Sequence, residues 1–143
     1  MATFISRGPA DTESLGDQLG RAALPGMVFA LSGELGAGKT QCVKGLARAL
    51  GIGARVHSPT FSLVNEYGGG RLKLFHLDLY RLETREQFLA AGLEDYLQPD
   101  GVTVIEWAER LRDWQFPDSD WKKIQIETSG ENERKIVYDD IGP

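Results

Sequence analysis

The fold of this chain is decided by Gly33-Glu34-Leu35-Gly36-Ala37-Gly38-Lys39-Thr40. This stretch matches the phosphate-binding loop G-x-x-x-x-G-K-[ST] at every fixed position. Glycines let the main chain turn its N–H groups inward around phosphate oxygens, and a helix that begins at the loop adds the positive end of its dipole. An apolar run, 27–31, precedes the stretch and a helical pattern follows it, so the setting favours a phosphate site over a chance glycine turn.

The loop predicts a binding site for a nucleoside triphosphate. Lys39 is expected to reach the β- and γ-phosphates, and the hydroxyl of Thr40 is expected to hold a magnesium ion. We find no motif in the sequence that separates ATP from GTP. The residues expected to line the phosphates are Gly33, Leu35, Gly36, Ala37, Gly38, Lys39 and Thr40.

Length and composition narrow the class of protein. A chain of 143 residues is long enough for one domain with a substantial core, so we expect a single domain over 1–143. The net charge of −5 argues against a protein that wraps nucleic acid by electrostatics alone, and any RNA contact is expected to be local or shared with a partner. Cys42 is the only cysteine, which excludes an internal disulfide, and we expect no disulfide-linked partner. No apolar stretch is long enough to span a membrane, so a cytoplasmic location is expected.

Hydrophobic patterns predict alternating strands and helices. The runs 27–31 and 102–105 are apolar on both faces, as in buried parallel strands. Glycines 68–70 join two further strands as a hairpin, and the last two strands alternate around Gly130. The expected strands are 4–5, 27–31, 61–67, 71–80, 102–105, 121–128 and 134–138. The expected helices begin at a cap formed by Asp11 or Thr12, at Lys39, at the capping box of Thr84 and Gln87, and at residues 93 and 109.

Two acidic residues stand where strands end. Glu106 follows the buried run 102–105, and Asp78 ends another strand. The carboxyl ends of parallel strands are where open α/β sheets bind their ligands, so Glu106 is expected to bind the metal or to activate water. The alternative for Glu106 is an ordinary solvated acid at a helix start. The alternative for Asp78 is a structural salt bridge with Arg81.

Two other residues near these acids have open roles. His76 shares a strand face with Asp78, and a hydrogen-bonded packing role is favoured over a catalytic one. Trp107 follows Glu106 and either stacks on a base or fills the core.

Four sequence blocks occur in order along the chain: GELGAGKT at 33–40, SPTF at 58–61, HLDLYR at 76–81 and VIEW at 104–107. Together, and at this chain length, they resemble the bacterial tRNA threonylcarbamoyladenosine biosynthesis ATPase family, TsaE, formerly called YjeE. The resemblance covers nearly the whole chain. It implies a three-layer α/β fold of the phosphate-loop nucleotide-binding type, with a mixed, mostly parallel sheet and antiparallel hairpins.

The same resemblance implies roles for residues of the site. Lys39, Asp78 and Glu106 would be the catalytic residues, with Asp78 acting near the γ-phosphate. Thr40 and Glu106 would hold Mg²⁺, and Trp107 would lie beside the nucleotide. A switch-like loop that responds to the nucleotide and touches partner proteins would be formed by Ser58, Pro59, Thr60 and Phe61.

The function implied by the resemblance is hydrolysis of ATP to ADP in support of TsaD-like and TsaB-like partners. These partners place a threonylcarbamoyl group on the adenosine next to the anticodon of tRNA, and contact of this chain with tRNA is expected to be indirect. Turnover by the isolated chain is expected to be slow. Two alternatives stay open: a small-molecule kinase, against which stands the lack of an arginine-rich lid segment, and a nucleotide-gated binding module whose hydrolysis is incidental.

Overall fold

Strand β2 (Val28–Gly33) lies at the centre of a mixed sheet and leads directly into the phosphate loop. The computed structural model describes residues 1–34, 36–57, 59, 63–118 and 120–139. In this part of the chain the sheet has seven strands in the order β1-β7-β6-β2-β5-β4-β3. The other elements are β1 (Ala2–Ser6), α1 (Pro9–Ala22), α2 (Lys39–Ala49), β3 (Val64–Tyr67), β4 (Leu74–Asp78), α3 (Arg85–Ala90), the 3₁₀ helix η1 (Leu93–Leu97), β5 (Val102–Glu106), α4 (Glu109–Asp113), β6 (Lys122–Thr128) and β7 (Arg134–Tyr138).

The parallel strands occupy the middle of the sheet. β2 pairs in parallel with β5 and β6, and β5 also pairs in parallel with β4. The antiparallel pairs β3–β4, β6–β7 and β1–β7 form the margins, so three of the six pairings among the described residues are parallel. The mixed sheet and both expected hairpins are confirmed. The carboxyl ends of β2, β5 and β4 therefore lie next to each other at one edge.

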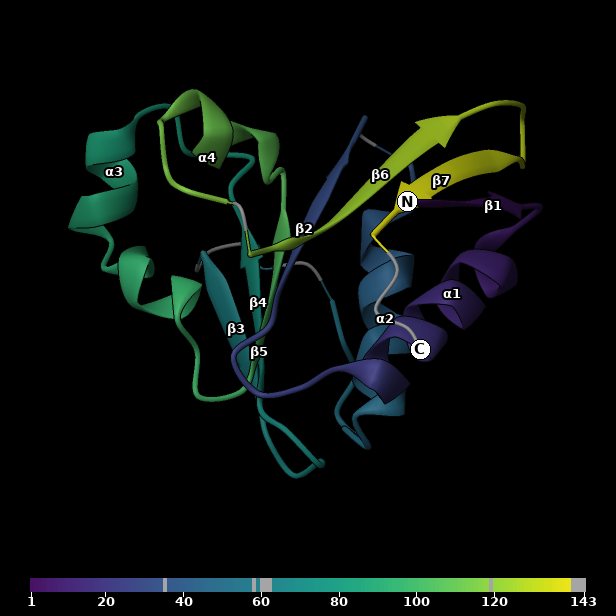
Figure 1. Cartoon of the computed structure of the whole chain (residues 1–143), viewed down its shortest axis with the longest axis horizontal. Helices are drawn as coiled ribbons and strands as arrows, with labels where there is room; N and C mark the ends of the chain where they lie inside the picture. The colour runs from purple at the N-terminus through teal and green to yellow at the C-terminus, as the bar shows by residue number, and fades with distance from the viewer. Residues whose placement is uncertain (35, 58, 60–62, 119, 140–143) are drawn as a thin grey trace.

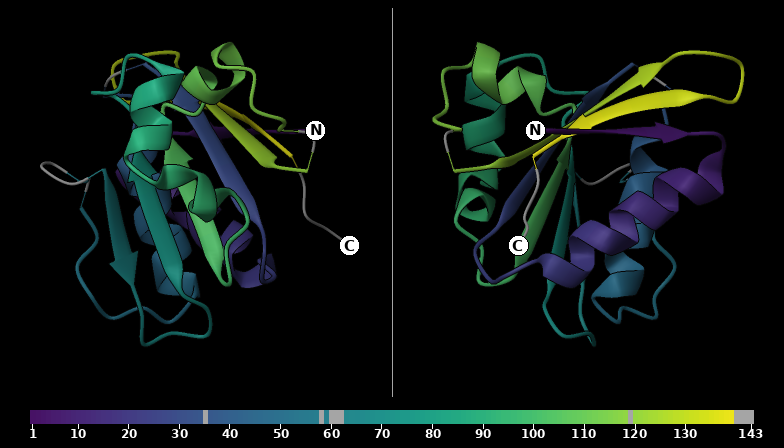
Figure 2. Two further views of the ribbon diagram at one scale, coloured as in Figure 1. Left: turned by 90° about the vertical axis from the view of Figure 1, so that its left-hand side faces the viewer. Right: turned by 45° about the vertical axis from the view of Figure 1, so that its right-hand side comes forward.

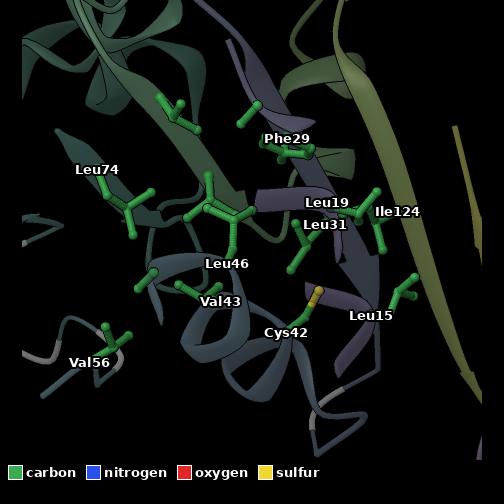
Figure 3. Packing of buried hydrophobic residues seen from close by; sticks show 14 of the residues in the cluster. Leu15, Leu19, Phe29, Leu31, Cys42, Val43, Leu46, Val56, Leu74 and Ile124 are labelled. Atoms are coloured by element: carbon green, nitrogen blue, oxygen red, sulfur yellow. The ribbon is translucent and has the colours of Figure 1, made fainter. Parts of the chain in front are cut away.

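Helices cover both faces of the sheet (Figure 1). α1 and α2 lie on one face and α3, η1 and α4 on the other, and the two views of Figure 2 show the same layers. Side chains alternate along β2, so Phe29 and Leu31 join the core beneath α1 and α2, whereas Val28 and Ala30 join the core beneath α3 and α4. Figure 3 shows the first of these cores, in which side chains of α1 and α2 meet those of the strands. The three-layer α/β fold is thereby confirmed.

Helices α1 and α2 approach each other closely at glycines. A Cβ atom at Gly45 of α2 would lie 1.8 Å from the carbonyl oxygen of Glu13, and one at Gly16 of α1 would lie 2.1 Å from that of Cys42. Gly20, one turn further along α1, meets the backbone of α2 in the same way. A helical carbonyl group cannot rotate out of such an overlap as a side chain could. Because α2 begins at the phosphate loop, this contact fixes the position of the loop against α1.

Replacing Gly45 with alanine should destabilise the protein. The methyl group adds up to about 1 kcal/mol of helix propensity, but overlap inside a packed core costs roughly 1–3 kcal/mol or more. We expect a net loss of about 2 kcal/mol in the free energy of unfolding, which is roughly 6 °C in Tm. Thermal unfolding measures this change. Gly53→Ala is the control because nothing lies within 4 Å of the added Cβ atom, and a Gly45→Ala protein as stable as the parent would contradict the close helix contact.

The two predicted helix caps had different outcomes. The capping box is confirmed, because Thr84 Oγ1 accepts from the N–H of Gln87 at 3.2 Å and Gln87 Oε1 accepts from the N–H of Thr84 at 3.2 Å. The prediction that Asp11 or Thr12 caps the first helix is wrong, since α1 already begins at Pro9. Proline is favoured at a first helical position, where its missing N–H would have no partner in the helix.

Cys42 lies in the core on α2 and forms no disulfide. Burial raises the pKa of its thiol to about 12, and the charge of Glu106 adds to the shift. The residue therefore packs as a small apolar side chain. Within the described ranges, no helix combines the length and apolarity needed to cross a membrane.

Candidate functional site

The phosphate loop joins β2 to α2 at the carboxyl edge of the parallel strands. Gly36 and Gly38 have φ angles of 80° and 102°, a region that favours glycine, and Gly38 is the N-cap of α2. A helix start presents N–H groups without intrahelical partners and the positive end of the helix dipole. The loop thus has the geometry of an anion site. The predicted loop residue Leu35 lies outside the described residues.

Lys39 lies within this loop, and only 5% of its surface is exposed. Its Nζ donates hydrogen bonds to the carbonyl oxygens of Gly33 at 2.6 Å and Glu34 at 3.2 Å. The same atom lies 3.7 Å from the centre of the Trp107 ring, a cation–π contact. Carbonyl dipoles and an aromatic face therefore hold the ammonium group at the loop.

The charge of Lys39 is balanced between burial and nearby acids. Burial lowers the pKa of this ammonium group, and the carboxylates of Glu106, Glu109 and Asp78 oppose the shift. No carboxylate of the described residues lies within 4 Å of Nζ. The carboxylates therefore influence the charge of Lys39, but none of those in the described part of the site forms an ion pair with it.

Glu106 is held against the start of α2. It is the last residue of β5, stands opposite Asp78 in β4 and Leu31 in β2, and is 3% exposed. Thr40 Oγ1 donates to its carboxylate, with distances of 3.2 Å to Oε1 and 3.1 Å to Oε2. The alternative of a solvated acid that caps a helix is wrong, because Glu106 is buried and the N-cap of α4 is Ala108. The two predicted metal ligands, Thr40 and Glu106, are therefore brought together.

Asp78 stands at the neighbouring strand end and is partly exposed. Its Oδ1 accepts a hydrogen bond from the N–H of Tyr80 at 2.9 Å. Burial raises the pKa of its carboxyl group, and the charge of Glu106 adds to this, while the N–H of Tyr80 opposes it. The alternative salt bridge with Arg81 does not form among the described residues. This hydrogen bond with Tyr80 therefore holds the Asp78 carboxylate at the cleft.

His76 is fully buried and contacts Glu106 directly. It lies two residues before Asp78 on β4, and its Nε2 is 2.5 Å from Glu106 Oε2. The other ring nitrogen, Nδ1, is buried without a hydrogen-bond partner in the described structure. His76 is thus buried and hydrogen-bonded, as expected, and its partner is the predicted metal ligand.

Trp107 has an unusual backbone conformation for a large side chain. Its φ is 63°, in the left-handed region. Hydrogen bonds on both sides of it fix the turn, from Leu79 N to Glu106 O at 3.2 Å and from Ala108 N to Leu31 O at 3.1 Å. Such strain costs on the order of 1–3 kcal/mol and is common where a side chain must be presented to a ligand. The indole ring contacts Tyr80, with 5.1 Å between ring centres, and packs on the core behind it.

These residues enclose a cleft of about 440 Å³ above the carboxyl ends of β2, β4 and β5. A cleft at this edge of a parallel sheet is the usual ligand position in α/β proteins. Of the predicted switch-like loop, Pro59 lines the cleft, whereas Ser58, Thr60 and Phe61 lie outside the described residues. The lining residues are Gly36, Ala37, Gly38, Lys39, Thr40, Gln41, Pro59, Leu63, Asp78, Tyr80, Arg81, Glu106 and Trp107.

Arg134, the first residue of β7, supports the phosphate loop. No role in the site was predicted for this residue from the sequence. Its Nε donates to the carbonyl oxygen of Ala37 at 3.2 Å, and its guanidinium also reaches the carbonyl oxygen of Gly36 at 3.5 Å. Carbonyl oxygens that are held from behind leave the N–H groups of the same loop turned toward the cleft. The only sequence signal for this contact was the position of Arg134 directly after the turn at Gly130.

Known proteins are similar to this chain in both sequence and fold. The family described as "Threonylcarbamoyl adenosine biosynthesis protein TsaE" matches residues 6–136 of this chain. A Bacillus subtilis protein named tRNA threonylcarbamoyladenosine biosynthesis protein TsaE is 40% identical over 134 residues, which are 94% of this chain and 82% of that protein. A Synechocystis protein of the same name is 49% identical over 105 residues, 70% of this chain and 66% of that protein.

A solved structure extends the similarity to three dimensions. The crystal structure of Bacillus subtilis YdiB superposes with a TM-score of 0.80 and 34% sequence identity, and it covers 99% of this chain and 86% of YdiB. The family match spans the phosphate loop, both strand-end acids and Arg134. This chain belongs to the TsaE family of threonylcarbamoyl adenosine biosynthesis proteins.

Proposed function

We propose that this chain hydrolyses ATP as the ATPase subunit of the machinery that makes N6-threonylcarbamoyladenosine in tRNA. One observation carries the proposal: Lys39, Thr40, Asp78 and Glu106 converge on a single cleft at the phosphate loop. Hydrolysis of a nucleoside triphosphate needs a phosphate cradle, a metal ligand and a group that orients water, and these residues match those needs. The names of its relatives supply the process in which the hydrolysis would act.

The loop would bind the phosphates of ATP. The N–H groups at the start of α2 would contact the β- and γ-phosphate oxygens, and the ammonium of Lys39 would offset their charge. Trp107 would border the nucleotide from the side of β5, where its ring also positions Lys39. The choice of ATP over GTP rests on the family and not on a contact with the base.

Thr40 and Glu106 fit a magnesium ion. Mg²⁺ prefers oxygen ligands and usually takes one or two protein ligands together with substrate phosphates. Within the described residues, no group of three or more acidic, histidine or cysteine side chains forms a cage of its own, so a site shared with the nucleotide agrees better with the structure. Bound there, the ion would neutralise charge that develops on the phosphates.

Asp78 would orient the attacking water near the γ-phosphate. It stands opposite Glu106 in the strand register, and its Oδ1 is fixed by the N–H of Tyr80. Burial raises the pKa of its carboxyl group. The carboxylate therefore accepts a proton from water more readily than the carboxylate of an ordinary exposed aspartate. TsaD-like and TsaB-like proteins are the proposed partners, and we expect them to accelerate slow intrinsic turnover.

The proposal is tested by reconstitution. The purified chain is mixed with TsaD-like and TsaB-like proteins, tRNA, a threonylcarbamoyl donor and ATP radiolabelled at the γ-phosphate, and free phosphate and modified adenosine are both measured. Release of phosphate that depends on the partners, together with formation of the modified nucleoside, is the expected result. Transfer of label to a metabolite from a cell extract, with little free phosphate, would instead identify a small-molecule kinase.

A further inference from the structure

We propose that His76 is a positioning residue that holds the carboxylate of Glu106 in place for the magnesium ion. The inference rests on the proposed function, because it concerns the metal ligand of that site. His76 shares a face of β4 with Leu74, which packs in the core beneath α1 and α2, and its exposed surface is zero. Among the described residues, its side-chain hydrogen bond toward the cleft is to Glu106 Oε2, 2.5 Å from Nε2.

The contact fixes which way the carboxylate faces. Ionised Glu106 accepts hydrogen bonds and cannot donate them, so Nε2 of His76 carries the proton and donates it to Oε2. Thr40 Oγ1 approaches both carboxylate oxygens from the start of α2, at 3.1 and 3.2 Å. His76 and Thr40 therefore hold the group from two different elements, β4 and α2. A ligand carboxylate held in this way needs little reorganisation when it binds a cation.

The hydrogen bond from His76 also opposes the formation of an ion pair between Glu106 and Lys39. Glu106 is the strongest of the carboxylates that favour the charged form of Lys39, so the two opposite charges attract each other inside a partly buried cleft. A direct ion pair would remove the ammonium from the phosphates and the carboxylate from the metal at once. In the structure Lys39 Nζ instead contacts the carbonyl oxygens of Gly33 and Glu34. The donor from His76 keeps the carboxylate on the side of Thr40.

The cost of burying His76 agrees with a role in positioning. Its Nδ1 has no hydrogen-bond partner in the described structure, and a buried polar atom without a partner destabilises the folded state. An apolar side chain of similar volume would avoid that cost, since the register neighbour Val104 and the nearby Leu74 are both fully buried and apolar. What His76 adds at this place is one donor, aimed at Glu106.

The test measures magnesium dependence without catalysis. Binding of a fluorescent, non-hydrolysable ATP analogue is followed as Mg²⁺ is added, for the parent, His76→Leu, His76→Gln, Glu106→Gln and the double variant. Loss of a residue that orients a metal ligand costs about 10- to 100-fold in metal affinity, so His76→Leu should raise the half-saturating Mg²⁺ concentration by about 10-fold or more. His76→Gln, whose amide N–H reaches the position of Nε2, should restore most of the loss.

The double variant separates positioning from a general structural effect. If His76 acts through Glu106, adding His76→Leu to Glu106→Gln should change nothing further. Val104→Ala is the matched control, because it disturbs packing at the neighbouring buried position without touching Glu106. If His76→Leu does not fold, His76→Asn replaces it, since its shorter amide cannot reach Glu106.

The outcomes distinguish this inference from the proposed function. A parent-like magnesium response in His76→Leu or His76→Asn, or losses that add fully in the double variant, would overturn the role of His76 and leave Glu106 as metal ligand. A parent-like response in Glu106→Gln would overturn the metal assignment itself, and the role of His76 with it.

Discussion

Lys39→Ala should weaken ATP binding by about 10- to 100-fold, because a hydrogen bond to a charged group contributes about 1.5–3 kcal/mol. The change also removes the charge that would stabilise the γ-phosphate in the transition state, which should slow hydrolysis by a further factor of about 10² or more. The ammonium already lies inside the loop, held by Gly33 and Glu34, so its position needs little rearrangement. Calorimetric titration with ATP measures the first effect, and phosphate release with the partners measures the second.

The control for Lys39 lies on the same helix. Lys44 is exposed on α2, one turn beyond the loop, and Lys44→Ala removes the same charge from the same element. This variant should bind and hydrolyse ATP as the parent does. Equal affinities for ATP in Lys39→Ala and the parent would mean that the loop does not bind the phosphates.

Glu106→Gln should lower the rate of phosphate release by about 10² while ATP still binds. The amide keeps the shape of the side chain and can still contact Thr40, but it lacks the negative charge that a magnesium ion requires. Phosphate release at saturating ATP, measured with the TsaD-like and TsaB-like partners, gives the rate. Glu109→Gln is the control, because that exposed acid also influences the charge of Lys39 but stands outside the carboxylate contact with Thr40.

The same variant separates hydrolysis from nucleotide gating. If the modified nucleoside still forms at the parent rate with Glu106→Gln while phosphate release is lost, the chain acts as a nucleotide-gated binding module. Loss of both would agree with a function that needs hydrolysis. A Glu106→Gln protein that releases phosphate at the parent rate would remove Glu106 from the mechanism.

The centre of the fold could be predicted because its signals are local. The strand before the loop, the helix after it and the capping box at Thr84 each follow from a few neighbouring residues. The meeting of Asp78 and Glu106 was predictable to the extent that both end strands, since carboxyl ends of parallel strands share one edge. The family blocks then pointed to the right family, which the sequence match confirms.

Features that depend on long-range pairing could not be predicted. The contact of His76 with Glu106 requires the register of β4 against β5, and that of Arg134 with the loop requires β6 to pair with β2. The positive φ of Trp107 follows from hydrogen bonds of its neighbours to Leu31 in β2 and to Leu79, the residue after β4. The sequence contains one sign of the close packing of α1 on α2, which is the spacing of Gly16 and Gly20. These two glycines allow the backbone of α1 to lie directly against the backbone of α2.

The most direct test of the cleft as an ATP site is a crystal structure of this protein with Mg²⁺ and a non-hydrolysable ATP analogue. We predict β- and γ-phosphate oxygens within about 3 Å of loop N–H groups between Gly36 and Thr40 and of Lys39 Nζ. The cation should lie between Thr40, Glu106 and the phosphates. An analogue bound away from the loop, or a cation held without Glu106, would contradict the site.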